Sequence, residues 1–124
     1  MKLSKNGKLI FDKFLKKDEK GDSIETPEDL LKRVAKDCAS IDRKFRASEY
    51  QVLESEKTFF SAMNNQEFLP NLPALANAGR ELQQLAACFV IPVEDSIEGI
   101  FKAVREMAII QKSGGGTGFN FSKP

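Results

Sequence analysis

One stretch limits the fold more than any other: a short, continuous apolar run over Ala86–Ile91, which Pro92 ends. Such a run is typical of a strand buried on both faces, as in a parallel sheet or a barrel. A second strand is expected at Phe119–Phe121, where apolar and polar residues alternate. The residues between them have helical character, and strand, helix and strand in this order predict a parallel α/β unit.

The helix between the two strands has a start, a buried side and an end in the sequence. Asp95 and Glu98 fit a capping box, and Lys112 falls in the expected last turn. Gly114 is placed where a left-handed residue would terminate the helix. Apolar residues at helical spacing predict the side that faces the sheet: Ile97, Ile100, Phe101, Val104, Met107 and Ala108.

The residues before this unit are expected to form a helical region. Thr26 and Pro27 suit the start of one helix, and Ser48 with Gln51 fits a capping box for another. The predicted apolar stripes are Leu30, Leu31, Val34, Cys38 and Ile41 in the first helix and Val52, Phe59, Phe60 and Met63 in the second. In Leu69–Arg80, Pro, Asn and Gly recur among apolar residues, which predicts a loop held against a core.

Length and composition exclude several classes of protein. The chain has 124 residues, which suits a single domain. Its net charge of +1 provides no field that would attract nucleic acid or an anionic membrane. No apolar run approaches the roughly 20 residues of a membrane span, and no signal-peptide core follows the basic N-terminus. A cytoplasmic protein with no nucleic-acid and no membrane partner is therefore expected.

The cysteines and the absence of histidine limit the chemistry. Cys38 and Cys88 are the two cysteines, with no Cys-x-x-Cys spacing, and no metal site is expected. Without histidine, the usual base of a Ser–His or Cys–His pair is missing. Cys38 lies in a predicted helical stripe and is expected to be a core thiol. Cys88 is either inert packing in its strand or a thiol that faces a pocket and takes part in thiol–disulfide or radical chemistry.

The glycine-rich segment Lys112–Gly118 has two interpretations. Glycines let a ligand approach bare backbone amides, which can cradle a phosphate or a ribose; the alternative is a helix stop followed by a flexible turn. The segment is not a Walker loop, because Lys112 precedes the glycines and a helix comes before the strand. Four glycines in five residues exceed what a helix stop requires, which favours a ligand contact.

Three segments together resemble class II, adenosylcobalamin-dependent ribonucleotide reductases: Leu69–Arg80, Gln84–Ser96 and Gln111–Phe119. Glu25–Asp29 is similar to the same family, and the resemblance covers nearly the whole chain. It implies a helix-rich α/β fold in which an N-terminal helical region, 1–68, leads into the first strands of a ten-stranded α/β barrel, 69–124. The barrel is expected to be truncated.

The resemblance implies roles for particular residues. In that family a cobalamin-generated thiyl radical acts on the ribose, and two further cysteines supply the reducing electrons and become a disulfide. Cys88 corresponds to one member of that pair. Ala87, Cys88 and Gly116 occupy positions that contact the substrate. Leu72 occupies another, where relatives usually carry Ser or Thr, and the hydroxyls are missing here because Leu72 and Ala74 replace them.

The resemblance also implies what other chains must supply. The radical cysteine, the second reducing cysteine and most of the cobalamin site have no counterpart here. The chain is expected to be an N-terminal fragment or subunit of a ribonucleoside-diphosphate reductase, inactive alone. Its expected partners are a ribonucleotide, a complementary C-terminal chain and a dithiol such as thioredoxin. Two alternatives remain open: a helical module that binds a nucleotide or protein without catalysis, and a non-functional truncated product.

Overall fold

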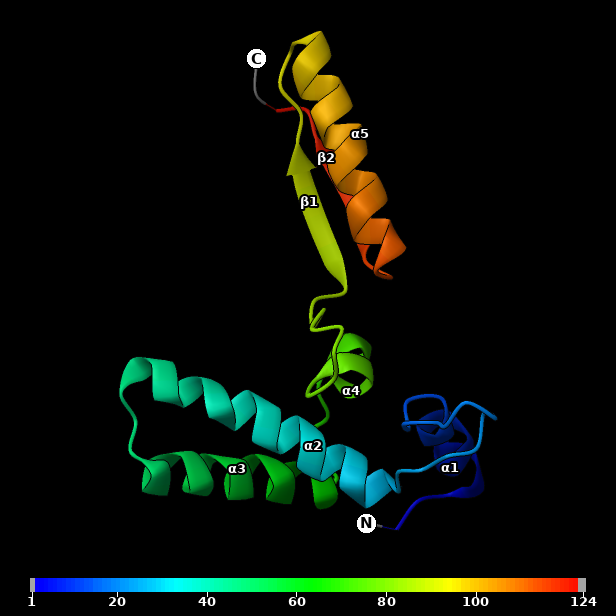
Figure 1. Ribbon diagram of the computed structural model, residues 1–124, viewed down its shortest axis with the longest axis vertical. Coiled ribbons are helices and arrows are strands. Elements are labelled where there is room, and N and C mark those ends of the chain that lie inside the picture. Colours follow the sequence, from blue (N-terminus) through cyan, green and yellow to red (C-terminus); the bar gives the residue numbers. More distant parts are fainter. Residues whose placement is uncertain (1, 123–124) are drawn as a thin grey trace. The chain divides into compact units, whose positions relative to one another are not determined.

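The computed structural model describes residues 2–122, and the chain divides into two compact units, Met1–Gln83 (unit 1) and Gln84–Pro124 (unit 2) (Figure 1). Unit 1 contains α1 (Lys5–Asp12), α2 (Pro27–Ser40), the 3-10 helix η1 (Ile41–Phe45), α3 (Glu49–Asn64) and α4 (Leu72–Asn77). Unit 2 contains β1 (Cys88–Pro92), α5 (Ile97–Lys112) and β2 (Gly116–Asn120). The expected helix-rich α/β class is confirmed.

Both long helices of unit 1 start as the sequence predicts. The backbone N–H of Asp29 donates to Thr26 Oγ1 at 3.2 Å, and the Asp29 carboxylate accepts from the Thr26 N–H at 3.1 Å. Ser48 and Gln51 form the same reciprocal pair at the start of α3. Each box gives partners to N–H groups that have none within the helix, so the helix starts are determined locally.

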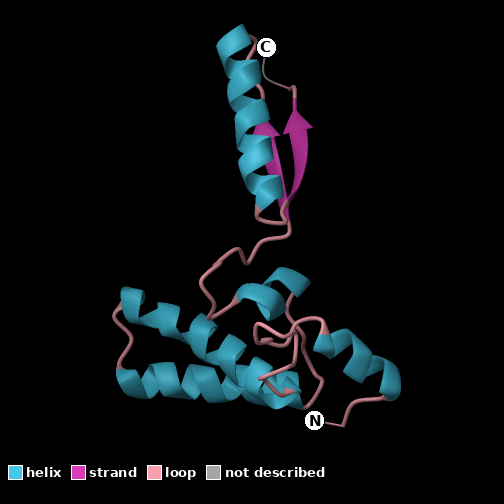
Figure 2. Cartoon of the chain, turned by 45° about the vertical axis from the view of Figure 1, so that its right-hand side comes forward, coloured by secondary structure: helices cyan, strands magenta, loops and turns pink. Residues whose placement is uncertain are grey.

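Helices α2 and α3 form a hairpin through η1 and pack along their length (Figures 1 and 2). The core between them and the neighbouring segments contains Leu30, Leu31, Val34, Ala35, Ala39, Val52, Met63 and Leu75. The start of the predicted α2 stripe is therefore confirmed. Its end is wrong: Cys38 is half-buried and Ile41 is exposed, because α2 stops at Ser40 and η1 turns the chain away.

The segment expected to be a loop contains a short helix, α4. Asn71 caps it, since its side chain accepts from the Ala74 N–H at 3.0 Å, and Pro73 lies in the first turn. Leu75 and Ala78 are buried, so the segment is held against the core as expected. The repeated Pro and Asn residues act as start signals for α4 rather than as breakers.

In unit 2, β1 and β2 are parallel neighbours, and α5 connects them and lies on one face of the pair (Figure 2). The register pairs Cys88 with Gly116 and Ile91 with Phe119. The predicted strand, helix and strand are therefore confirmed. The prediction that β1 is buried on both faces is wrong within this unit: Ile91 is buried, but Val90 is 74% exposed. Helix α5 covers one face, and no described residue of unit 2 covers the other.

The predicted apolar stripe of α5 is confirmed at Met107, but most of its other residues are exposed. Gly99 and Ala103 are buried, and Met107 and Ile110 pack on the cluster of Ile91, Val93 and Ala103. Ile97, Phe101 and Val104, expected to face the sheet, are exposed. A methyl group at Gly99 would lie 2.7 Å from Glu94 Cβ, so glycine at this position lets the start of α5 pack directly against the segment that follows β1.

The start of α5 also differs by one residue from its prediction. Ser96 is the N-cap, and its Oγ accepts from the Gly99 N–H at 2.9 Å. The capping box expected between Asp95 and Glu98 does not form. The end is as predicted: Gly114 has φ +89°, in the left-handed region that glycine tolerates without strain.

Candidate functional site

The candidate site lies at the beginning of the parallel pair in unit 2. Cys88 is the first residue of β1, and its side chain is exposed as a free thiol. Side chains alternate between the faces of a strand, so Cys88, Val90 and Pro92 share the face that α5 leaves open. The thiol is therefore accessible at the strand end, and the interpretation of Cys88 as buried packing does not hold within this unit.

Gly116 is the register partner of Cys88, and the two strands begin together there. The Gly116 N–H donates to the Ala87 carbonyl at 2.8 Å, which brings Ala87, Cys88 and Gly116 into one local group. A methyl group at Gly116 would lie 3.5 Å from the Ala87 oxygen and 4.0 Å from Cys88 Sγ. These are ordinary contacts, so packing within unit 2 does not require glycine at this position. What glycine provides is open space beside the thiol.

The glycines of this segment have different roles. Gly114 supplies the left-handed turn that ends α5. Gly115 is buried, and a methyl group there would lie 2.6 Å from Ile110 Cγ2 and 3.0 Å from the Phe89 ring. Gly118 would meet nothing within 4 Å. Helix termination and packing thus account for Gly114 and Gly115, whereas Gly116 and Gly118 lie on the open side of the sheet.

Two side-chain contacts that sequence reasoning did not assign hold the glycine-rich segment in place. The hydroxyl of Ser113 donates to Gln84 Oε1 at 2.9 Å, which ties the end of α5 to the chain before β1. Gln111 Nε2 donates to Thr117 Oγ1, also at 2.9 Å, across the turn. All four residues belong to the segments that carry the family resemblance, which is the sequence signal that could have identified them.

Leu72 is in unit 1, apart from the other three candidate residues along the chain. It is the first residue of α4, directly after the Asn71 cap, and its side chain is 57% exposed. Ala74, the other position where a hydroxyl is missing, is buried. The structure therefore gathers Ala87, Cys88 and Gly116 in unit 2 and places Leu72 at an exposed helix start in unit 1.

The second cysteine has a different environment. Cys38 is half-buried on α2, and burial raises the pKa of its thiol, with the nearby charge of Asp37 adding to the effect. A raised pKa lowers the thiolate fraction and so the reactivity of the sulfur. Among the described residues, no group of three or more Cys, Asp or Glu could hold a metal ion. Cys88 is therefore the better candidate for chemistry.

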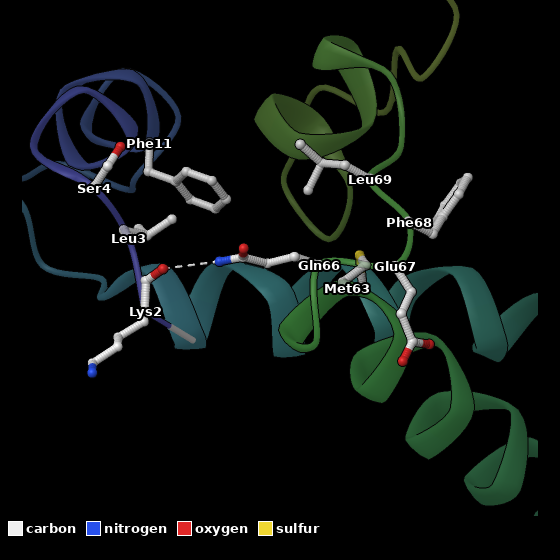
Figure 3. A pocket seen from close by; sticks show the side chains of 9 residues that line it. All are labelled: Lys2, Leu3, Ser4, Phe11, Met63, Gln66, Glu67, Phe68 and Leu69. Carbon is white, nitrogen blue, oxygen red and sulfur yellow. Dashed lines mark hydrogen bonds between the residues drawn. The ribbon is translucent and has the colours of Figure 1, made fainter.

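A pocket in unit 1 contains none of the candidate residues (Figure 3). It is an open hollow of about 490 Å³ between the N-terminal segment and the end of α3, with Phe11, Met63 and Leu69 in its wall. Gln66 Nε2 donates to the Lys2 carbonyl at 3.0 Å across it, as the dashed line in Figure 3 shows.

Within residues 2–122, no helix has the length and apolar character needed to cross a membrane.

Known families match both units in order. The family described as "Ribonucleotide reductase, all-alpha domain" matches residues 1–83, and "Ribonucleotide reductase, barrel domain" matches residues 86–123. The chain is 57% identical over 65 residues to the vitamin B12-dependent ribonucleoside-diphosphate reductase of Thermoplasma acidophilum. This alignment covers 52% of the chain and 8% of that protein. It is 37% identical over 114 residues to the Mycobacterium tuberculosis enzyme of the same name. That alignment covers 92% of this chain and 16% of the relative.

More distant relatives carry a different name. The ribonucleoside-diphosphate reductase subunit alpha of Helicobacter pylori is 32% identical over 115 residues, which cover 93% of this chain and 14% of the relative. The chain thus spans less than a fifth of the length of each of these relatives. The similarity itself extends over both units.

Proposed function

Because this chain belongs to the family of ribonucleotide reductase large chains, we propose that it is the N-terminal part of an adenosylcobalamin-dependent ribonucleoside-diphosphate reductase. In this proposal the catalytic portion begins at residue 69, so it includes α4 with Leu72 as well as unit 2. The relatives named for vitamin B12 dependence support the cofactor class. The substrate would be a ribonucleotide, with a diphosphate favoured by the names of these relatives.

The proposed role of Cys88 is to supply one of two reducing thiols. In the overall reaction the C2′–OH bond of the ribose breaks, a C2′–H bond forms, and the hydroxyl leaves as water. Two thiols become one disulfide, which accounts for the two electrons and two hydrogens consumed. Unit 2 contains a single cysteine, so the second thiol must come from outside it. A dithiol such as thioredoxin then restores both thiols by exchange through a mixed disulfide.

One observation carries this proposal: the exposed Cys88 thiol is paired in register with a glycine that nothing in unit 2 requires. A substrate lying on the open face of the β1–β2 pair would meet the thiol, the Ala87 backbone and the free space at Gly116. Leu72, in unit 1, is proposed as a further substrate position by resemblance alone, and its side chain has no hydroxyl to hydrogen-bond a ribonucleotide.

The described residues do not by themselves fit adenosylcobalamin. The chain has no histidine, so it offers no imidazole as an axial ligand to the cobalt. When bound to the whole enzyme, the cofactor would supply the radical chemistry. We propose that it binds mainly outside this segment, while this chain orients the ribose and provides the Cys88 thiol.

Reconstitution tests the proposal. The full chain would be combined, as a separate chain or as a fusion after Pro124, with the C-terminal remainder of the Thermoplasma acidophilum relative. The mixture would contain adenosylcobalamin, a ribonucleoside diphosphate and dithiothreitol. Formation of deoxyribonucleotide by the combination, and by neither part alone, is the expected result. Turnover by the isolated chain would contradict the fragment proposal, and micromolar nucleotide binding by the isolated chain would favour a binding module instead.

Cys88→Ser and Cys38→Ser form a matched pair within the same assay. Cys88→Ser is expected to reduce dithiol-driven turnover to background while nucleotide binding, measured by calorimetry, persists. Cys38→Ser should leave turnover unchanged, because its thiol is half-buried on α2 and burial raises its pKa. Unchanged turnover in Cys88→Ser would exclude the proposed role of this thiol.

A further inference from the structure

A buried ion pair in unit 1 has no part in the proposed chemistry. Arg33 on α2 donates from Nε to Glu25 Oε1 at 2.7 Å and from Nη2 to Glu25 Oε2 at 3.1 Å. The side chains are 9% and 6% exposed, respectively. Charges this deeply buried are costly unless each is fully paired and hydrogen-bonded. The remaining N–H donors of the Arg33 guanidinium therefore need hydrogen-bond acceptors.

Those partners are carbonyl groups of the α4 segment. Arg33 Nη2 donates to the Leu75 carbonyl at 3.3 Å, and Nη1 donates to the Ala78 carbonyl. The last carbonyls of a helix lack partners within it, and a cation at this end also complements the helix dipole. Gly79 has φ +67°, and a methyl group there would lie 2.8 Å from Arg33 Cγ, so the chain leaves α4 in direct contact with the Arg33 stem.

The same cluster reaches the N-terminal segment. Glu25 Oε2 accepts from the Lys16 N–H at 2.9 Å. Arg80 Nη2 donates to the Phe14 carbonyl at 2.6 Å and lies 3.7 Å from Glu25 Oε2. Three segments distant in sequence thus meet at one guanidinium–carboxylate pair. The pair has fixed geometry because both groups are planar and the contact between them is bidentate.

Helix α4 depends on such external contacts. It has six residues, too few to be stable as an isolated helix in water. Its buried residues, Ala74 and Leu75, hold one side of it against the core. Arg33 holds its carboxyl end, and Leu72 lies exposed at the other end of the same short rigid element. A shift of the carboxyl end would therefore move the backbone at Leu72.

We infer that Arg33 is a positioning residue: paired with Glu25, it holds the Leu75 and Ala78 carbonyls and so fixes the backbone of α4, including Leu72, within unit 1. The inference rests on the proposed function, in which the position of Leu72 contacts the ribonucleotide. Arg33 itself touches no substrate in this assignment. Its effect passes through the backbone of α4.

Hydrogen exchange on the full chain tests the local part. Arg33→Met keeps the apolar stem and removes the guanidinium. Lys32→Met is the matched control, since Lys32 is the adjacent residue on α2 and forms an exposed ion pair with Glu28 at 2.8 Å. Arg33→Met should speed exchange at the amides of Leu75, Ala78 and Arg80 by roughly tenfold or more, while α2 and α3 keep the rates of the control. Equal protection of the α4 amides in the two variants would overturn the inference.

The reconstituted reductase tests the functional part. With Arg33→Met, the KM for the ribonucleoside diphosphate should rise by about tenfold while kcat stays within about twofold of wild type, and Lys32→Met should change neither. A general loss of structure would lower the active fraction and hence kcat without raising KM. An unchanged KM overturns the inference. A wild-type complex without turnover contradicts the proposed function instead, so the two failures are distinguishable.

A conservative variant decides the outcome if Arg33→Met unfolds unit 1. Arg33→Lys keeps the positive charge beside Glu25, but one ammonium cannot donate to both carboxylate oxygens and two carbonyls. Arg33→Lys should leave amide exchange in α2 and α3 unchanged and speed exchange at the α4 amides. Like Arg33→Met, it should also raise the KM for the ribonucleoside diphosphate. Wild-type exchange at α4 and a wild-type KM in Arg33→Lys would show that charge alone suffices and would overturn the positioning role.

Discussion

The two units bury apolar residues to very different extents. Unit 1 buries Leu30, Leu31 and Leu75 almost completely between its helices. Unit 2 has a core cluster of only Ile91, Val93 and Ala103 among its described residues. Met107 and Ile110 are partly buried against this cluster, whereas Val90 and Phe101 are exposed. Unit 1 therefore has an interior of its own, whereas unit 2 presents one covered and one open face.

The two units also differ in their ion pairs. Unit 1 contains a buried ion pair that joins three segments. Within residues 84–122, the structure shows no ion pair, and two glycines are closely packed: Gly99 against Glu94, and Gly115 against Ile110 and Phe89. Unit 1 is thus stabilised by a buried apolar core and a buried ion pair. Unit 2 is stabilised by hydrogen bonding between its two strands and by close packing at its glycines. Exposed apolar surface and an exposed thiol occur together in unit 2.

The largest expected effect is on the unit 1 core. Leu30→Ala removes a fully buried side chain and should lower the free energy of unfolding by about 2–5 kcal/mol. Val90→Ala, on the open face of β1, should change it by less than about 0.5 kcal/mol. Native-state hydrogen exchange of α2–α3 and of β1–β2 measures the two changes. Comparable losses in the two variants would mean that the open face is covered in solution.

Close packing in unit 2 should give the next largest effect. Gly115→Ala places a methyl group against Ile110 and Phe89 and should destabilise the unit by about 1–3 kcal/mol. Gly118→Ala is the control, because a methyl group there meets nothing within 4 Å. Exchange protection of α5 amides reports the difference. A stable Gly115→Ala variant would show that α5 and the strands separate at little cost.

Acid should weaken unit 1 through Glu25. Burial raises the pKa of this carboxyl, but hydrogen bonds from Arg33 and the Lys16 N–H, together with the charges of Arg33 and Arg80, outweigh it and hold the pKa below 4.5. A group whose pKa is lower in the folded state stabilises fully above its unfolded pKa. That stability is lost as the pH falls from about 4.5 through the folded pKa.

A pH series of exchange rates in unit 1 measures this loss. Glu25→Gln should lower stability at neutral pH and flatten the dependence below pH 4.5. Glu28→Gln is the control: its ion pair with Lys32 is exposed, and such pairs contribute little to stability. If both variants keep the wild-type acid dependence, another carboxyl is responsible.

The smallest effect is a difference in thiol reactivity. Cys88 should react several-fold faster than Cys38 with a thiol reagent at neutral pH, because Cys38 is half-buried and its pKa is raised by burial and by Asp37. Single variants, Cys38→Ser and Cys88→Ser, report one thiol each. Equal rates would show that α2 opens readily at Cys38 and would weaken the contrast between the units.

Local signals in the sequence determined where α2 and α3 begin and where α5 ends. The caps at Thr26 and Ser48 and the terminating Gly114 each involve residues within a few positions of one another, so they can be identified without knowing the fold. The order of strand, helix and strand likewise followed from apolar periodicity. The motif segments around Cys88 and Gly116 were identified by resemblance, and the parallel register brings these two residues together.

Only the tertiary structure decided which faces are buried and what holds α4. Helix α5 has apolar residues on more than one side, and its buried residues are the small Gly99 and Ala103. At Gly99 the neighbouring Glu94 Cβ leaves no room for a methyl group, a constraint that periodicity cannot reveal. Arg33 contacts Ala78, which lies 45 residues away in sequence. No local pattern encodes such a contact, because it depends on where the folded chain returns. The sequence determined the helix caps, the strand–helix–strand order and the candidate thiol Cys88. Packing determined which faces are buried and which contacts hold α4.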